Sequence, residues 1–233
     1  MRERKSVDAN GITISYLVDG PVEAPVVVLV HGNGGSADNW ATVMDGLAPD
    51  HRVYAMDLRG HGSSTWPGEY SLKLFAEDVR RFPEALGLSD VVLVGHSLGG
   101  MAAMLAAQEA PSWLARLVLE DAPMPRPGWM RREMPPRPEQ LTNDWDALAP
   151  ALVEQLNNPD PVWWERLGEI TVPTLSLAGG SESHVPQENL ILAAERITQG
   201  RVRSISVGHL IHDNAPEQFL REVRAFLAET TPL

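Results

Sequence analysis

The feature that most constrains the fold of this chain is the sequence GHSLGG at residues 95–100. It follows the apolar run at residues 91–94 and precedes residues 101–110, which have helical spacing. Glycines on both sides of the serine allow a strand to turn sharply into a closely packed helix, and such a turn raises the Ser97 hydroxyl above the sheet edge. The N-terminus of that helix also favours developing negative charge. A bare Gly-x-Ser-x-Gly is weak evidence, but this strand and helix context predicts a nucleophile elbow.

Elsewhere in the chain, short β-branched runs alternate with longer segments in which apolar residues recur three and four positions apart. This alternation predicts the α/β class, with a doubly wound, mostly parallel eight-stranded sheet and helices on both faces. A turn at Asn10 and Gly11 joins the first two strands. The predicted strands are residues 5–8, 12–18, 26–30, 52–56, 91–94, 115–120, 173–178 and 202–207. The predicted helices are residues 37–47, 72–86, 98–110, 187–198 and 216–228.

Residues 122–169 interrupt this alternation, because they contain nine prolines and four tryptophans between two predicted strands. The prolines exclude a long helix from the first half, whereas residues 145–156 could form one short helix. Ligands of a doubly wound sheet bind at the carboxyl ends of its strands, so a segment inserted there can cover the site. We therefore expect a core of residues 1–121 and 170–233 with a short lid at 122–169. The alternative is a surface loop that packs only on itself.

Composition limits the function classes. The formal charge of −12 would repel nucleic acid and anionic membranes. The chain has no cysteine, which excludes disulfides, thiolate metal sites and a cysteine nucleophile. The longest aliphatic run, residues 26–30, is too short to cross a membrane, and no signal-like apolar stretch follows the basic start. We expect a cytoplasmic protein that acts on a small molecule without metal or cofactor, in an oligomeric state that the sequence leaves open.

A serine hydroxyl needs a general base to attack at neutral pH, and histidine has a suitable pKa. His209 follows the last predicted strand, so the loop at the strand end would bring it to the same sheet edge as Ser97. His212, three residues later, is the alternative base. Three other histidines lie in neighbouring loops and are expected to be hydrogen-bonded structural residues: His31, His61 and His96.

Hydrolysis through a tetrahedral intermediate also needs two preorganised donors for the oxyanion. One is expected to be the backbone N–H of Leu98, the residue after the nucleophile. The other is expected from the glycine-rich sequence HGNGGS at residues 31–36, most readily the N–H of Asn33. A phosphate-binding loop is the alternative for these glycines, but the spacing Gly-x-Gly-x-x-Gly and a following lysine are absent.

Four landmarks occur in the order typical of one superfamily: HGNG at 31–34, DLRGHGSS at 57–64, GHSLGG at 95–100 and GH at 208–209. Together they resemble the α/β-hydrolase superfamily over nearly the whole chain. The resemblance implies the α/β-hydrolase fold with Ser97 as nucleophile and His209 as base. It also implies that the N–H groups of Asn33 and Leu98 form the oxyanion hole. None of these landmarks identifies a substrate.

The triad acid departs from the common pattern. Many members of the superfamily place an aspartate after the penultimate strand, but residues 178–186 contain none. Others, such as haloalkane dehalogenases, place it after the preceding strand, and the sequence LEDAP at 119–123 resembles that arrangement. We expect Asp121 to be the acid, because Glu120 and Asp121 cannot both face the site without a bend in the strand and Asp121 lies nearer its end. Glu182 is the second choice.

These residues predict hydrolysis of a carboxylic ester, or of a lactone or thioester, through an acyl-enzyme on Ser97. Tryptophans of residues 122–169, with Trp40 and Trp66, favour an apolar or aromatic substrate group, although core packing explains some of them equally well. A serine in the elbow argues against dehalogenase and epoxide hydrolase chemistry, for which similar families use an aspartate. The alternatives are a cofactor-free perhydrolase, a small-molecule-binding protein without turnover, and a biosynthetic accessory protein that uses the pocket for cyclisation or decarboxylation.

Overall fold

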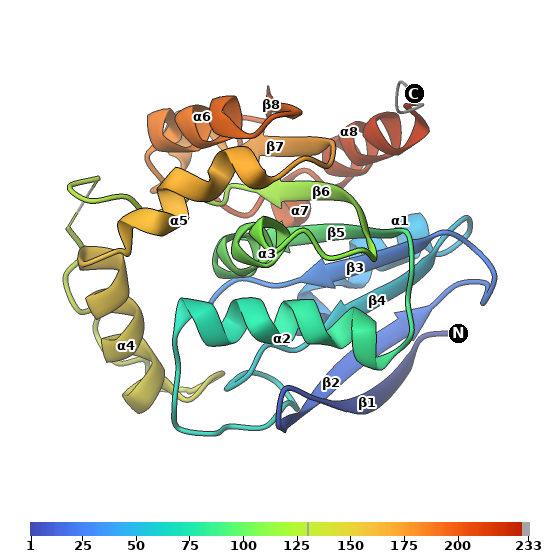
Figure 1. Ribbon diagram of the computed structural model, residues 1–233. Helices are drawn as coiled ribbons and strands as arrows, with labels where there is room; N and C mark the ends of the chain where they lie inside the picture. Colours follow the sequence, from blue (N-terminus) through green and yellow to red (C-terminus); the bar gives the residue numbers. More distant parts are fainter. Residues whose placement is uncertain (130, 230–233) are drawn as a thin grey trace.

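The computed structural model describes residues 1–129 and 131–229 and contains an eight-stranded sheet between two layers of helices (Figure 1). The strand order is β1-β2-β4-β3-β5-β6-β7-β8. The pairs β1–β2 and β2–β4 are antiparallel, and every other neighbouring pair is parallel. The strands are β1 Glu3–Ala9, β2 Ile12–Asp19, β3 Val26–Val30, β4 Arg52–Met56, β5 Val91–His96, β6 Leu114–Glu120, β7 Thr174–Ala178 and β8 Gly200–Ser204. The predicted fold class is confirmed.

Helices cover both faces of the sheet. In Figure 1, α2 and α3 lie in front of the sheet, and α1 and α8 lie behind it. The α-helices are α1 Ala41–Leu47, α2 Leu72–Ala85, α3 Leu98–Gln108, α4 Trp145–Asn157, α5 Pro161–Glu165, α6 Gln187–Arg196, α7 Ile211–Asn214 and α8 Pro216–Ala228. Three short 3-10 turns accompany them: η1 Ala37–Trp40, η2 Arg166–Glu169 and η3 Gly180–Glu182. None of the helices in the described residues is long and apolar enough to span a membrane.

The central strands are apolar on both faces because each face has its own core. In β3, Val28 and Val30 pack in the core beneath α2 and α3, whereas Val27 and Leu29 pack in the core beneath α1 and α8. Alternate strand residues point to opposite faces, so a strand buried on both sides is a continuous apolar run. This arrangement places the carboxyl ends of β3, β5 and β6 side by side at one edge of the sheet.

The structure differs from the prediction at β8, which ends at Ser204 rather than at residue 207. Its partner β7 ends at Ala178, which pairs with Ser204, so no strand remains for the next residues to pair with. Ile205 nevertheless stays buried in the core beside α8. The apolar residues Ile205 and Val207, which suggested a longer strand, therefore contribute to packing rather than to the sheet.

Residues 122–169 lie between β6 and β7 and will be called the inserted segment. Its first half contains no helix among the described residues, as its prolines predict, and its second half contains α4, α5 and η2. The helix predicted at 145–156 is present as α4, but α5 was not predicted. Asp160 begins α5 by accepting a hydrogen bond from the Val162 N–H, and Pro161 occupies the first helical position, where its missing N–H costs nothing.

Candidate active site

Ser97 stands between the last residue of β5 and the first residue of α3, in a backbone conformation (φ +50°, ψ −114°) that is rare for a non-glycine residue. The glycines around it are required by close packing. A Cβ on Gly95 would lie 2.6 Å from the Gly99 carbonyl oxygen, and one on Gly99 would lie 2.5 Å from the carbonyl oxygens of Val30 and His31. The strand-to-helix turn expected from the sequence is therefore present, with the strained serine typical of a nucleophile elbow.

His209 lies in the loop between β8 and α7, and its ring pairs with a carboxylate. Its Nδ1 lies 2.7 Å from Oδ2 of Asp121, the residue directly after β6. An ionised carboxylate can only accept a hydrogen bond, so Nδ1 donates and Nε2 remains the ring nitrogen that can take up a proton. The structure thus brings together the two residues that the sequence named as base and acid.

Four donors converge on the buried carboxylate of Asp121. Its Oδ1 accepts hydrogen bonds from the Gly179 N–H at 2.9 Å and from Nε2 of Gln187 at 3.0 Å. Its Oδ2 accepts from the Ser183 hydroxyl as well as from His209. Burial raises the pKa of Asp121, but these hydrogen bonds outweigh burial and hold the pKa below its ordinary value. Asp121 is therefore ionised at neutral pH, as a residue that orients a histidine must be.

Glu182, the second candidate for the acid, is exposed at the end of η3 and makes no hydrogen bond with His209 among the described residues. The segment after β7, where many members of the superfamily carry the acid, instead supplies donors to Asp121. Ser183 and Gln187 were not singled out in the sequence. Their only signal there is that polar side chains follow a strand end, at the place where the aspartate is missing.

Glu120, next to Asp121, binds a different histidine. Its Oε1 accepts a hydrogen bond from the His212 N–H at 2.7 Å, and both of its oxygens lie 2.8 Å from Nδ1 of His212. Both side chains are almost completely buried, and the His212 ring stacks on Trp40 at 4.4 Å between centroids. Glu120 and Asp121 can both face histidines of this region because the backbone bends at Asp121, whose φ is +41°. His212 therefore pairs with Glu120, whereas His209 pairs with Asp121.

We expect Glu120→Gln to destabilise the fold. Glu120 holds a pKa below its ordinary value although burial opposes ionisation, and His212 has a raised pKa because Glu120 attracts its charged form more strongly than burial disfavours it. Removing one partner of a buried ion pair costs about 3–5 kcal/mol. Urea denaturation at pH 7 measures this loss, with Glu188→Gln, an exposed position on α6, as the control. Equal unfolding free energies for wild type and Glu120→Gln would contradict the ion pair.

The three histidines expected to be structural are each hydrogen-bonded and buried. His31 Nε2 accepts from the Leu58 N–H at 3.0 Å, and His61 Nε2 accepts from the Gly34 N–H at 3.1 Å. His96 contacts the proposed base directly: its Nε2 donates to the carbonyl oxygen of His209 at 3.0 Å, and the two ring centroids lie 4.6 Å apart. His96 therefore fixes the backbone of the loop that carries His209.

Because these three histidines are buried in their neutral form, we expect the protein to lose stability in mild acid. Burial lowers the pKa of His31 and His96 to about 4 and that of His61 to about 3. In the unfolded chain they titrate near 6.5, so between about pH 4 and 6.5 the unfolded state binds more protons and stability rises with pH. His212 contributes with the opposite sign, because its pKa is raised and its stabilisation is lost as pH rises through that value. The pKa of His184 is lowered as well, so four groups oppose one, and the urea midpoint should be higher at pH 7 than at pH 5.5. A midpoint that is equal or lower at pH 7 would contradict the neutral state of the three histidines.

A cavity of about 370 Å³ adjoins Ser97, and the two expected oxyanion donors belong to residues that line it, Asn33 and Leu98. Leu98 begins α3, and N–H groups in the first turn of a helix have no acceptor within the helix. Asn33 is held by the inserted segment, because its Oδ1 accepts a hydrogen bond from Nδ2 of Asn143 at 3.0 Å. The inserted segment thus contributes both to the wall of the cavity and to the placement of the Asn33 loop.

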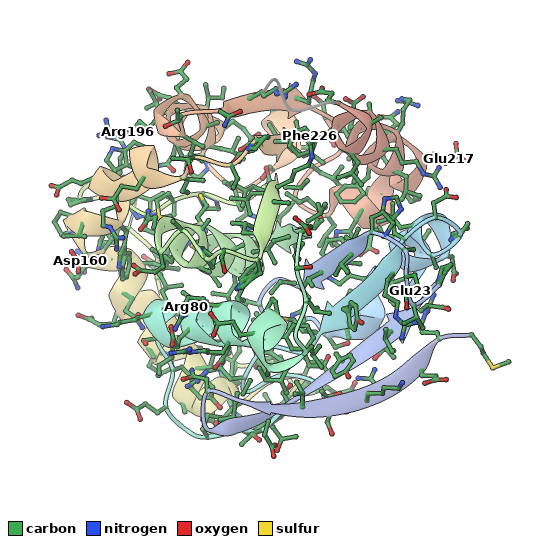
Figure 2. The ribbon with its side chains drawn as sticks, turned by 45° about the vertical axis from the view of Figure 1, so that its right-hand side comes forward. Glu23, Arg80, Asp160, Arg196, Glu217 and Phe226 are labelled. Carbon is green, nitrogen blue, oxygen red and sulfur yellow. The ribbon has the colours of Figure 1, made fainter. Side chains whose placement is uncertain are left out.

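A larger hollow of about 620 Å³ lies elsewhere, at the far end of α3 from Ser97. Figure 2 labels two of its lining residues, Arg80 and Asp160, on the same side of the molecule. Half of its lining residues are charged, and none of the residues named as nucleophile, acid or base lines it. The smaller cavity is therefore the candidate substrate site. Within residues 1–129 and 131–229, no three histidine or acidic side chains are grouped so that they could hold a metal ion.

Comparison with known proteins gives matches over most of the chain. A family model described as the alpha/beta hydrolase fold matches residues 25–161. The chain is 26% identical to a putative esterase/lipase of Haemophilus influenzae, over 91% of this chain and 86% of that protein. It is also 26% identical to an sn-1-specific diacylglycerol lipase of Mus musculus, over 97% of this chain and 88% of that protein.

Among solved structures, the chain is similar to Est816, described as an enzyme that degrades N-acyl homoserine lactones. The TM-score is 0.77 at 25% sequence identity, covering 95% of this chain and all of the other. It is also similar in fold to a putative lipase from Acinetobacter baumannii, with a TM-score of 0.83 at 23% identity over 97% of this chain and 91% of the other. Both similarities extend over at least 95% of this chain.

Proposed function

The chain belongs to the alpha/beta hydrolase fold family, and on that premise we propose that this hydrolase is a serine enzyme that cleaves carboxylic esters, with lactones and thioesters as related substrates. The observation that carries the proposal is the hydrogen bond from His209 to the buried, ionised Asp121, next to an elbow that presents Ser97. The esterase and lipase relatives support ester chemistry.

In the proposed mechanism, the Ser97 hydroxyl oxygen attacks the carbonyl carbon of the ester, and His209 Nε2 takes the hydroxyl proton. Asp121 keeps the His209 ring in the required tautomer and stabilises its cation. The oxyanion accepts hydrogen bonds from the backbone N–H groups of Asn33 and Leu98. The alcohol leaves with the proton from His209, and the acyl group remains on Ser97. Water, deprotonated by His209, then releases the acid and restores the serine.

The inserted segment is proposed to act as a short lid over a core of residues 1–121 and 170–233. Support comes from the cavity beside Ser97, part of whose wall is Trp129, Trp145 and Leu152 of that segment. Walls of this kind favour an apolar acyl or alcohol group, since burial of apolar area drives binding. A cavity of about 370 Å³ is at the small end of the range for ligand sites, which favours a short substrate.

Rapid mixing of the wild-type protein with short-chain p-nitrophenyl esters tests the proposal. An acyl-enzyme whose formation is faster than its hydrolysis releases p-nitrophenol in a burst that matches the enzyme concentration, followed by steady turnover. Steady turnover without a burst also supports the proposal if added hydroxylamine partitions the acyl group to a hydroxamate. Tight binding of the ester without release of p-nitrophenol would reject it in favour of a binding protein on the same fold.

A further inference from the structure

The cavity beside Ser97 is charged at one place, the stretch of the inserted segment at residues 131–133. Arg131, Arg132 and Glu133 all contribute to its wall. Most of the remaining wall is apolar, as in Met101, Pro123, Trp129, Trp145, Leu152 and Leu156. A cationic group in a mostly apolar pocket determines which ligand can bind there, because any group placed against it must compensate its charge.

Arg132 is anchored through its backbone to the last residue of α4. Its N–H donates to Oδ1 of Asn157 at 2.7 Å, and Nδ2 of Asn157 donates to its carbonyl oxygen at 2.9 Å. This pair of hydrogen bonds fixes the position from which the side chain extends. The cation is therefore presented to the cavity by a tethered backbone.

The guanidinium of Arg132 has no partner among the described residues. Its Nε is buried and makes no hydrogen bond. No carboxylate of residues 1–129 or 131–229 forms an ion pair with it, and burial alone lowers its pKa. The chain has 31 acidic residues against 19 basic ones, so acidic partners are plentiful. A partly buried cation without a counter-ion is costly, and such a cost is typical of groups that meet a ligand.

Other buried or partly buried arginines of the protein have partners. Arg59 forms a two-pronged ion pair with Asp78, with hydrogen bonds of 2.5 and 2.7 Å. Arg126, also in the inserted segment, has an unbonded Nε like that of Arg132, but its guanidinium lies 5.4 Å from the centre of the Trp164 ring. Arg132 differs from both, because neither a carboxylate nor an aromatic face among the described residues compensates its charge.

Arg132 also shares the cavity with a histidine whose ring contacts that of the proposed base, His209. His184 lines the same cavity, and its ring centroid lies 4.2 Å from that of His209. The pKa of His184 is lowered by burial, by His209 and by the charge of Arg132, so the guanidinium acts on the ring that contacts the base. A small substrate bound at Ser97 could therefore reach Arg132.

We propose that Arg132 binds a carboxylate of the substrate, so that the natural substrates are esters that carry a free carboxylate on their acyl or alcohol part. The inference rests on the proposed function of the same site. A planar guanidinium binds a carboxylate through two parallel hydrogen bonds, and these are stronger in a poorly solvated site. Arg132 is the partly buried charge of the stretch at residues 131–133, whereas Arg131 and Glu133 are exposed and of opposite sign, so the stretch carries a net charge of one and matches a monoanion better than a doubly charged phosphate.

Two matched ester pairs test the inference on wild-type protein. For the acyl side, p-nitrophenyl hydrogen adipate is compared with its methyl ester; for the alcohol side, meta-(butanoyloxy)benzoate is compared with its methyl ester. We expect the anionic member of at least one pair to have a kcat/KM about tenfold or more above its neutral partner. No preference for the anion in either pair would overturn the inference.

Substitution of Arg132 tests whether this residue causes the preference for the anionic ester. We expect Arg132→Gln to lower the anionic-to-neutral ratio of kcat/KM by about 30-fold or more, mainly through KM, since it removes one side of a poorly solvated charge pair. Arg132→Lys should keep part of the ratio, because it retains the charge without the planar geometry. Arg137→Gln is the matched control: Arg137 is exposed in the same segment, is paired with Asp146, and does not line the cavity. Its ratio should stay within about twofold of wild type.

The outcomes separate this inference from the proposed function. Ester turnover that persists in Ser97→Ala rejects the proposed function itself. Turnover that depends on Ser97, with the same anionic-to-neutral ratio in wild type and Arg132→Gln, rejects the carboxylate subsite alone. If Arg132→Gln does not fold, the two wild-type pairs decide, and added adipamate, a monoanion, should inhibit neutral-ester hydrolysis more strongly than added neutral adipamide. Equal inhibition by the two would also overturn the subsite.

Discussion

Ser97→Ala should lower kcat/KM for a p-nitrophenyl ester by about 10⁴- to 10⁶-fold, because loss of the nucleophile removes the acyl-enzyme route and leaves only binding and the oxyanion donors. The substitution should leave the elbow intact. Its backbone bonds do not use the hydroxyl: the Ser97 N–H donates to the Glu120 carbonyl at 3.0 Å, and the Ser97 carbonyl accepts from the Met101 N–H at 2.9 Å.

Steady-state assays of purified protein measure this loss, and the exposed Ser112→Ala serves as the control. The control should retain wild-type kinetics. Equal rates in wild type and Ser97→Ala would mean that Ser97 is not the nucleophile. In that case the elbow would be a structural turn and the cavity a binding site without this chemistry.

Asp121→Asn should lower kcat by about 10⁴-fold, the loss typical of a triad acid replaced by its amide. An asparagine can present its amide N–H to His209 Nδ1, which favours the tautomer that cannot take the serine proton at Nε2. By contrast, Glu182→Gln should change kcat less than about threefold, because Glu182 is exposed and makes no hydrogen bond with His209 among the described residues.

Measuring kcat for the two variants in parallel distinguishes the two candidate acids. Because Asp121 accepts four hydrogen bonds, unfolding in urea should be recorded for each variant, so that a loss of folded protein is not read as a loss of catalysis. The reverse pattern, with Asp121→Asn active and Glu182→Gln inactive, would assign the role to Glu182.

Much of the fold could be predicted because its determinants are local. The run Val26–Val30 is apolar throughout since each of its faces has a core, and α8 occupies the residues 216–228 expected from its spacing. The elbow was predictable for the same reason: the short distances from Gly95 and Gly99 to neighbouring backbone require glycine at both positions.

The hydrogen-bond partners of Asp121 depend on long-range geometry, which no local sequence pattern contains. A positive φ at Asp121 is what allows Glu120 and Asp121 to face His212 and His209 respectively, and non-glycine residues seldom adopt it. Ser183 reaches Asp121 across 62 positions of sequence, through the parallel pairing of β6 and β7. The end of β8 likewise depends on where its partner strand ends. Such features follow from strand pairing rather than from the residues themselves.

The most direct test of the central claim, that Ser97 carries the acyl group, is the intact mass of the protein after reaction with a fluorophosphonate ester, followed by peptide mapping. If Ser97 is the nucleophile, one adduct forms per chain and lies on Ser97, and its formation is prevented by Ser97→Ala and strongly slowed by Asp121→Asn. Absence of an adduct in the wild type, or an adduct on any other residue, would contradict that claim.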